Sequence, residues 1–202
     1  MIRDAINRRY DMIHYLYTTF YQATITGLPL MRNMFMEYPD EQALWTSSNQ
    51  FMLGDKMLVA PKLEAPSEEL EKAQRQAVQY MLPTSDIWYN YYSKKLESTA
   101  KDAWTYTNLP DLEQAVFIKG GSVLPILGHE GCMALTKCIN NTISLEVYLD
   151  SEGKATGEIY TDDGVSYNTK MSKDYALTGF LWEKSSLISW IMSDTEYAFP
   201  AT

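Results

Sequence analysis

Hydrophobic residues follow two different patterns along the chain, and the pattern changes after Tyr38. At the start of the chain, apolar side chains recur every three or four positions. This is the spacing of one helical face, and it predicts a helix over residues 3–25. Gly27 and Pro29 end this helix, because glycine accepts the left-handed turn that follows a helix and proline cannot continue one. The next run, Leu30–Tyr38, is rich in Met and Phe and is predicted to be a strand.

From Gln50 onward, short apolar runs alternate with turn residues. Spacing of this kind favours the strands of an antiparallel β-sandwich. A lone helix and strand cannot bury both of their apolar faces, so the N-terminal segment is expected to belong to a larger α/β domain, and the chain to be a C-terminal piece. The strands expected in the second pattern are Gln50–Leu53, Met57–Leu63, Val78–Leu82, Ile87–Tyr92, Ala115–Lys119, Ser122–Ile126, Ile143–Leu149, Ala155–Tyr160, Tyr175–Trp182 and Leu187–Ile191.

Composition and charge narrow the class of protein. Hydrophobic residues make up 46% of the 202 residues and charged residues 21%, proportions that exclude a disordered chain. The net charge of −9 argues against a nucleic-acid partner, which would need clustered Lys and Arg. The sequence has no apolar run of about 18 residues, so no membrane span is expected. A charge-rich segment, Ser67–Gln76, is predicted to be a short exposed helix capped by Ser67.

The two cysteines leave the redox compartment open. Cys132 and Cys138 are close enough in sequence for a disulfide that staples a hairpin, and two free thiols are the alternative. One N-glycosylation sequon, Asn140-Asn141-Thr142, follows in an expected loop. These features lean towards a secretory or lysosomal parent protein. The charged first residues do not form a signal peptide, so any signal is expected outside this chain.

The chain lacks the motifs of common catalytic and cofactor sites. It has no phosphate-binding glycine loop, no His-Glu-x-x-His zinc motif and no Gly-x-Ser-x-Gly nucleophile elbow. His14 is expected to be packed or hydrogen-bonded within the predicted helix, and His129 lies in a loop with too few neighbouring ligands to hold a metal. We therefore assign no catalytic, cofactor-binding or metal-binding residue from the sequence.

Three further groups of polar residues are interpreted as structural. Asp162-Asp163-Gly164 is predicted to be a turn between strands; paired carboxylates or a calcium loop are alternatives, but the other calcium ligands are missing. Arg32 and Glu37 fall on opposite faces of the predicted strand, so they are not expected to pair with each other. Lys119-Gly120-Gly121-Ser122 joins two predicted strands instead of opening a helix, so a tight turn is expected and not a phosphate cradle.

Several short segments occur in a fixed order along most of the chain. They are Arg9-Tyr10, Tyr15-Leu16-Tyr17-Thr18, Gly27-Leu28-Pro29-Leu30-Met31-Arg32, Met34-Phe35-Met36-Glu37-Tyr38-Pro39, Gln50-Phe51-Met52-Leu53-Gly54, Leu58-Val59-Ala60-Pro61, Trp88-Tyr89, Phe117-Ile118-Lys119-Gly120-Gly121-Ser122-Val123-Leu124-Pro125 and Asp162-Asp163-Gly164. In this order they resemble the C-terminal half of an α-glucosidase of glycoside hydrolase family 31. Asn33, Ser48 and Lys119 depart from the family pattern, which usually has Pro, Asp and Arg at these positions.

The resemblance implies a (β/α)8 barrel with two β-sandwich domains behind it. A whole barrel takes about 250 residues, so this chain would hold only its last helix and strand. The expected fold class is mainly β, with antiparallel β-sandwich domains preceded by the last helix and strand of a (β/α)8 barrel. The expected divisions are residues 1–45 for the barrel remnant, 46–127 for the proximal β-sandwich domain and 128–202 for part of the distal one.

The resemblance also implies a reaction for the complete enzyme. Family members cleave α-linked glucosides with retention of configuration, using one carboxylate as nucleophile and a second as general acid/base. Both lie on earlier barrel strands in the family, in motifs absent here, so no Asp or Glu of this chain inherits either role. The implied partner is an α-glucoside or α-glucan substrate, with no cofactor. The hypothesis is a C-terminal fragment of a retaining α-glucosidase, inactive alone; the alternative is a stand-alone carbohydrate-binding or structural β-sandwich protein without catalysis.

Overall fold

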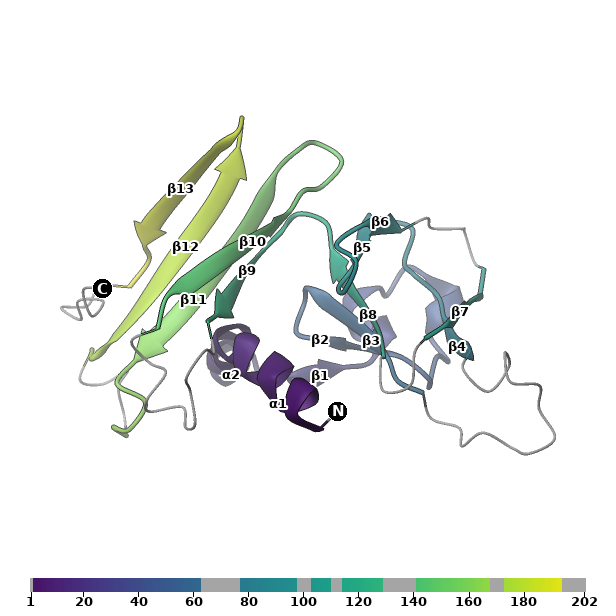
Figure 1. Ribbon diagram of the computed structural model, residues 1–202, viewed down its shortest axis with the longest axis horizontal. Helices are drawn as coiled ribbons and strands as arrows, with labels where there is room; N and C mark the ends of the chain where they lie inside the picture. The colour runs from purple at the N-terminus through teal and green to yellow at the C-terminus, as the bar shows by residue number, and fades with distance from the viewer. Residues whose placement is uncertain are drawn as a thin grey trace. The chain divides into compact units, whose positions relative to one another are not determined.

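The chain folds into two compact units, which are mainly antiparallel β-sheet (Figure 1). Unit 1 consists of Met1–Leu28 and Gly121–Thr202, and unit 2 consists of Pro29–Gly120. The computed structural model describes residues 2–62, 77–97, 103–109, 114–128, 141–167 and 173–193. The predicted helix at Ser67–Gln76, the pair of Cys132 and Cys138, His129 and the sequon residue Asn140 lie outside the described residues.

Two consecutive helices open unit 1. These are α1 (Ile2–Asp11) and α2 (Ile13–Thr26), which are separated at Met12. The sequence predicted one continuous helix, and the structure adds this break. Helix α2 ends at Gly27, whose φ of 76° is left-handed and whose N–H donates to the carbonyl of Ala23. The predicted end of the helical segment is therefore confirmed.

Helix α2 lies against a five-stranded sheet of order β10-β9-β11-β12-β13 (Figure 1). Neighbouring strands are antiparallel, except for one parallel bridge between β9 and β11. At this crossing a Cβ atom on Gly157 would lie 2.2 Å from the carbonyl oxygen of Val123, so only glycine fits between the two strands. The strands are β9 (Ser122–Leu127), β10 (Ile143–Tyr148), β11 (Ala155–Asp162), β12 (Tyr175–Glu183) and β13 (Ser186–Ile191).

Unit 2 contains a six-stranded antiparallel sheet of order β1-β2-β3-β8-β5-β6 and a separate antiparallel pair, β4 and β7. Its core side chains include Leu44, Met52, Leu58 and Trp88, all 0% exposed. Its elements are β1 (Met31–Arg32), α3 (Met34–Glu37), the 3-10 helix η1 (Gln42–Leu44), β2 (Phe51–Leu53), β3 (Met57–Ala60), β4 (Ala77–Tyr80), β5 (Trp88–Asn90), β6 (Leu96–Glu97), β7 (Thr105–Asn108) and β8 (Ala115–Lys119).

The prediction of a strand over Leu30–Tyr38 was wrong. Only the two residues of β1 pair with a neighbour, and helix α3 follows directly. Asn33 lies between them with extended backbone, and its side-chain oxygen accepts a hydrogen bond from the N–H of Phe35. This is the geometry of a helix N-cap. An apolar run of this length is compatible with a strand or a helix, and the cap decides between them.

Candidate functional site

The polar side chains of unit 1 gather where helix α2 meets strand β11. Asp162 is 7% exposed, and one of its carboxylate oxygens accepts hydrogen bonds from the hydroxyls of Tyr17 at 2.7 Å and Tyr160 at 2.9 Å. The hydroxyl of Thr18 accepts a bond from the backbone N–H of Tyr160 at 2.9 Å. Two of these hydrogen bonds therefore join residues that are more than 140 positions apart in the sequence.

Aromatic rings stack around the same carboxylate. Tyr160 stacks on Tyr21 with ring centroids 4.3 Å apart and on Tyr175 with centroids 5.4 Å apart. Burial and the bond to Asp162 raise the pKa of Tyr17, and burial together with a bond to Tyr175 raises the pKa of Tyr21 to about 12. We call Tyr17, Tyr21, Tyr160, Tyr175 and Asp162 the tyrosine clasp. The phenols of Tyr17 and Tyr21 stay neutral at physiological pH. The hydrogen bonds of Tyr17 and Thr18 join helix α2 to strand β11.

The segment Asp162-Asp163-Gly164 is a turn as predicted, and Oδ1 of Asp162 takes part in it by accepting the N–H of Gly164 at 2.9 Å. Asp162 also has a second role. That residue ends strand β11 and belongs to the clasp. Asp163 accepts the N–H of Ser166 at 2.9 Å, and Gly164 has a left-handed φ of 68°. The bonds from Ser166 lower the pKa of Asp163. Each carboxylate thus has its own structural partners.

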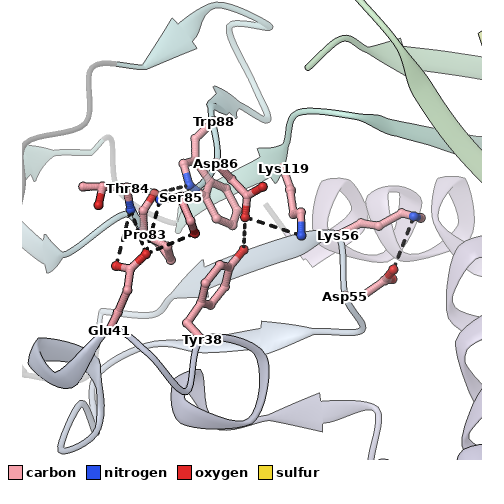
Figure 2. A network of polar contacts seen from close by, with 10 residues as sticks. All are labelled: Tyr38, Glu41, Asp55, Lys56, Pro83, Thr84, Ser85, Asp86, Trp88 and Lys119. Atoms are coloured by element: carbon pink, nitrogen blue, oxygen red, sulfur yellow. Dashed lines mark hydrogen bonds and ion pairs between the residues drawn. The ribbon is translucent and has the colours of Figure 1, made fainter. Parts of the chain in front are cut away.

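A second polar cluster lies inside unit 2, and Figure 2 shows it from close by. The hydroxyl of Tyr38 donates to Asp86 at 3.0 Å, and Lys119 Nζ lies 3.4 Å from the same carboxylate oxygen. Lys119 Nζ is also 5.7 Å from the centre of the Tyr38 ring, within the range of a cation–π contact. Burial and the charge of Asp86 raise the pKa of Tyr38. The buried tyrosine, the carboxylate and the lysine therefore hold one another in place.

The loop that carries Asp86 is anchored at further points. The Glu41 carboxylate accepts the backbone N–H of Thr84 at 3.1 Å and the hydroxyl of Ser85 at 3.1 Å (Figure 2). The indole N–H of Trp88 donates to the carbonyl of Pro83 at 2.9 Å. Both acidic side chains of this cluster thus hold a loop against the core of unit 2.

Arg32 and Glu37 pair with each other, so the prediction that they would not was wrong. Arg32 is 5% exposed, and its Nη1 lies 2.6 Å from Glu37 Oε1. Its Nε donates to the carbonyl of Pro29 at 2.9 Å. The prediction failed because it assumed a strand, whereas helix α3 brings the two residues to the same side. Arg32 therefore links both ends of the segment from Pro29 to Glu37.

The other positions singled out in the sequence lie in a connection between strands and on a helix. Lys119-Gly120-Gly121-Ser122 links β8 to β9, so its interpretation as a connection between strands is confirmed. His14 lies on α2, where burial lowers its pKa, and its Nε2 has no hydrogen-bond partner among the described atoms. Within the described ranges, no group of three or more His, Cys, Asp or Glu is placed to hold a metal ion. No helix among the described residues is long and apolar enough to cross a membrane.

Neither cluster is recognisable from the sequence. The bond between Tyr17 and Asp162 spans 145 positions, and that between Tyr38 and Asp86 spans 48. The only signal in the sequence is the abundance of tyrosine, with 15 residues against 6 phenylalanines. Such a composition predicts buried hydroxyls that need partners, but it does not say which carboxylates provide them.

The chain is similar to known proteins along most of its length. A model described as the glycosyl hydrolase family 31 C-terminal domain matches residues 27–124. Neutral alpha-glucosidase AB of Mus musculus is 31% identical over 193 residues, which are 93% of this chain and 19% of that protein. An alpha-glucosidase of Schizosaccharomyces pombe is 34% identical over 180 residues, which are 87% of this chain and 17% of that protein.

The chain belongs to glycosyl hydrolase family 31. A crystal structure of a family 31 relative, the glucosidase II alpha subunit, matches 94% of this chain with a TM-score of 0.82 and 25% identity. The match covers 20% of that structure, so this family 31 chain spans about a fifth of the length of its relatives. The family resemblance and the mainly antiparallel β fold expected from the sequence are confirmed.

Proposed function

We propose that this chain is the C-terminal supporting part of a retaining α-glucosidase, and that the catalytic carboxylates lie outside it. The main support for the proposal is the small share of each relative's length that aligns with this chain. Relatives named alpha-glucosidase match 87–93% of this chain, which makes up only 17–19% of their length. Retaining glycosidases need two carboxylates about 5–5.5 Å apart across the scissile bond. Asp86, Asp162 and Glu37 are instead occupied by tyrosine, lysine and arginine partners, which suits a supporting role.

Exposed apolar side chains on helices α1 and α2 support the proposal that another part of the enzyme packs against them. Ile6, Phe20 and Ile25 are 45%, 53% and 60% exposed, although α2 also buries Tyr15 and Thr19. A helix with apolar residues on its exposed side as well as its buried side is typical of packing between two layers. In the complete enzyme we assign residues 1–45 to the barrel, 46–127 to the proximal β-sandwich and 128–202 to part of the distal one.

A substrate class and a compartment of the complete enzyme are part of the proposal. We propose that the complete enzyme hydrolyses α-linked glucosides or glucans, as the name alpha-glucosidase of the relatives implies. We also propose a parent in the secretory pathway. The match to the ER glucosidase II heterodimeric complex, at 23% identity and a TM-score of 0.84, is a likeness of fold alone. The sequon at Asn140 agrees with such a parent.

Complementation tests the proposal. The Schizosaccharomyces pombe alpha-glucosidase is expressed without the C-terminal region that aligns with this chain, and hydrolysis of an aryl α-glucoside is measured with and without the chain. We expect turnover only when both pieces are present, because the barrel needs its missing last elements. Failure of this chain, where the relative's own C-terminal region restores turnover, would contradict the proposal.

Variants of helix α2 make the complementation specific. Phe20→Asp and Ile25→Asp place a charge on the exposed apolar side, so we expect each to lower the restored turnover. Thr24→Asp, at an exposed polar position of the same helix, is the matched control and should leave it unchanged. Equal effects of all three variants would show that this side of the helix has no apolar partner.

A further inference from the structure

Strand β13 differs from the other strands of its sheet because all six of its residues are exposed. It pairs with β12 on one side, and within the described residues no strand lies on its other side. Leu187, Ile188, Trp190 and Ile191 are 44%, 52%, 44% and 67% exposed. An edge of this kind presents unpaired N–H and C=O groups together with apolar side chains, which is a template for another strand.

The usual protections of an edge strand are missing from this segment. Native edges are blocked by charged residues, proline or bulges. The sequence from Ser185 to Ser193 contains no charged residue and no proline, whereas β10, at the other edge, carries Glu146. Copies of a chain with a net charge of −9 repel each other over most of their surface, but β13 adds no charge to that repulsion.

The hydrogen bonds of the sheet define which groups of β13 are available. The N–H of Met192 donates to the carbonyl of Leu177 at 2.7 Å. Backbone groups of alternate residues point to the same side of an antiparallel strand. The N–H and C=O groups of Leu187, Ser189 and Ile191 therefore face away from β12.

We propose that β13 is a self-pairing edge through which two copies of this chain form one continuous sheet. The two β13 strands run antiparallel, with a two-fold axis at Ser189, so that the outward backbone groups of the two copies bond to each other. Such an interface is isologous, because the same residues contribute from both copies. This register pairs Ser189 with Ser189 and Leu187 with Ile191 of the second copy.

Both sides of the sheet gain apolar neighbours in this register. Leu187 and Ile191 lie on the side that carries an open hollow of about 480 Å³, whose lining includes Ile159 and Phe180. Ile188 lies on the opposite side and meets Trp190 of the second copy. No charged residue of β13 is opposed across the axis, so the pairing buries apolar surface without desolvating a charge.

Charge variants at the axis test the proposal by sedimentation of the whole chain. Ser189→Lys places two like charges directly opposite each other, so we expect the dissociation constant of the dimer to rise at least about tenfold. Ser189→Glu should do the same, and an equal mixture of the two variants should associate again. Ser144→Lys, at an exposed position of the opposite edge strand β10, is the matched control and should dimerise like the unaltered chain.

Amide exchange measured residue by residue supplies the second readout. In the dimer we expect the N–H groups of Leu187, Ser189 and Ile191 to become protected, and in the dissociated Ser189→Lys variant to exchange fast. An unaltered chain that remains monomeric at about 100 μM, a dimer in which these amides stay unprotected, or association unchanged by Ser189→Lys would each overturn the proposal.

Discussion

Unit 2 contains a closed core, and unit 1 contains an edge strand whose residues are all exposed. In unit 2, Leu44 and Trp88 are fully buried, and the hydrogen-bonding group of the indole is satisfied within the unit. Among the described residues of unit 1, the core cluster around Ile159 has four buried side chains, and β13 is exposed along its whole length. The same chain therefore contains one unit with a closed core and one unit with an edge strand that is exposed along its whole length.

The polar clusters follow the same division. In unit 2, Asp86 links a buried tyrosine to Lys119 and holds a loop on the core. In unit 1, Asp162 fastens helix α2 to the sheet, while Phe20 on the same helix remains 53% exposed. A cluster in unit 2 reinforces a core that already exists, whereas the tyrosine clasp is a principal attachment of its helix. This contrast leads to predictions that differ between the units.

The largest effect is expected in the core of unit 2. Trp88→Ala removes a fully buried ring and leaves the carbonyl of Pro83 without its donor, so we expect a loss of about 3–5 kcal/mol in the free energy of unfolding. Urea unfolding measures it. Trp45→Ala is the matched control, because Trp45 is 50% exposed although its indole also bonds a proline carbonyl. Equal losses at the two positions would show that unit 2 has no closed core.

The tyrosine clasp should be the most sensitive polar site of unit 1. Asp162→Ala removes the shared acceptor of the Tyr17 and Tyr160 hydroxyls, and we expect a loss of about 2–3 kcal/mol because two donors are left unsatisfied. Asp163→Ala, at the exposed neighbouring position, should cost less. Thermal unfolding of both variants decides the order, and a larger loss for Asp163 would contradict the clasp.

A smaller effect on the free energy of unfolding is expected when the pH is lowered and His14 of unit 1 becomes protonated. Burial lowers the pKa of His14 below its ordinary value of 6.5, so the folded state binds fewer protons than the unfolded state between the lowered pKa and 6.5. The stability that neutral, buried His14 contributes to the folded state is complete above pH 6.5. It is lost as the pH falls from 6.5 towards the lowered pKa. Urea unfolding at neutral pH and at about pH 5 should therefore show a smaller pH-dependent loss for His14→Gln than for the unaltered chain. An identical loss in both proteins would exclude this role for His14.

The smallest effect is expected on the exposed side of helix α2. Phe20→Ser should change the free energy of unfolding by no more than about 0.5 kcal/mol, because the ring is 53% exposed and buries little apolar surface in this chain. Tyr15→Ser on the same helix, where the side chain is 4% exposed, should cost about 2–4 kcal/mol. Denaturant unfolding compares the two. A large loss for Phe20→Ser would mean that its ring is already covered.

Sequence patterns predicted those elements whose local signals agree with their final positions. The helical period and Gly27 predicted the end of α2, and the strand at Ala115–Lys119 was predicted with its observed bounds. Strands β6 and β7 were missed, because they are short, largely polar and defined by pairing with β5 and β4. Local pattern carries no information about such partners.

The failures at the polar sites have a related cause. Arg32 and Glu37 were placed on one strand, and the Asn33 cap that changes the geometry was not weighed against the apolar run around it. Asp162 was interpreted as a turn residue because Asp-Gly is a strong turn signal, and its Oδ1 does accept the N–H of Gly164. Its bonds to Tyr17 of helix α2 and to Tyr160 were not predicted. A carboxylate used across distant segments cannot be recognised from spacing.

The central claim is that the catalytic carboxylates lie outside this chain, and an activity assay of the purified chain tests it most directly. Release of the leaving group from an aryl α-glucoside is measured at acidic and at neutral pH beside a mock purification. We predict a rate equal to that of the mock sample, because the carboxylates of Asp86, Asp162 and Glu37 are bonded to structural partners and the catalytic pair is expected outside this chain. Turnover that follows the chain through two columns and disappears when one Asp or Glu is replaced would contradict the claim.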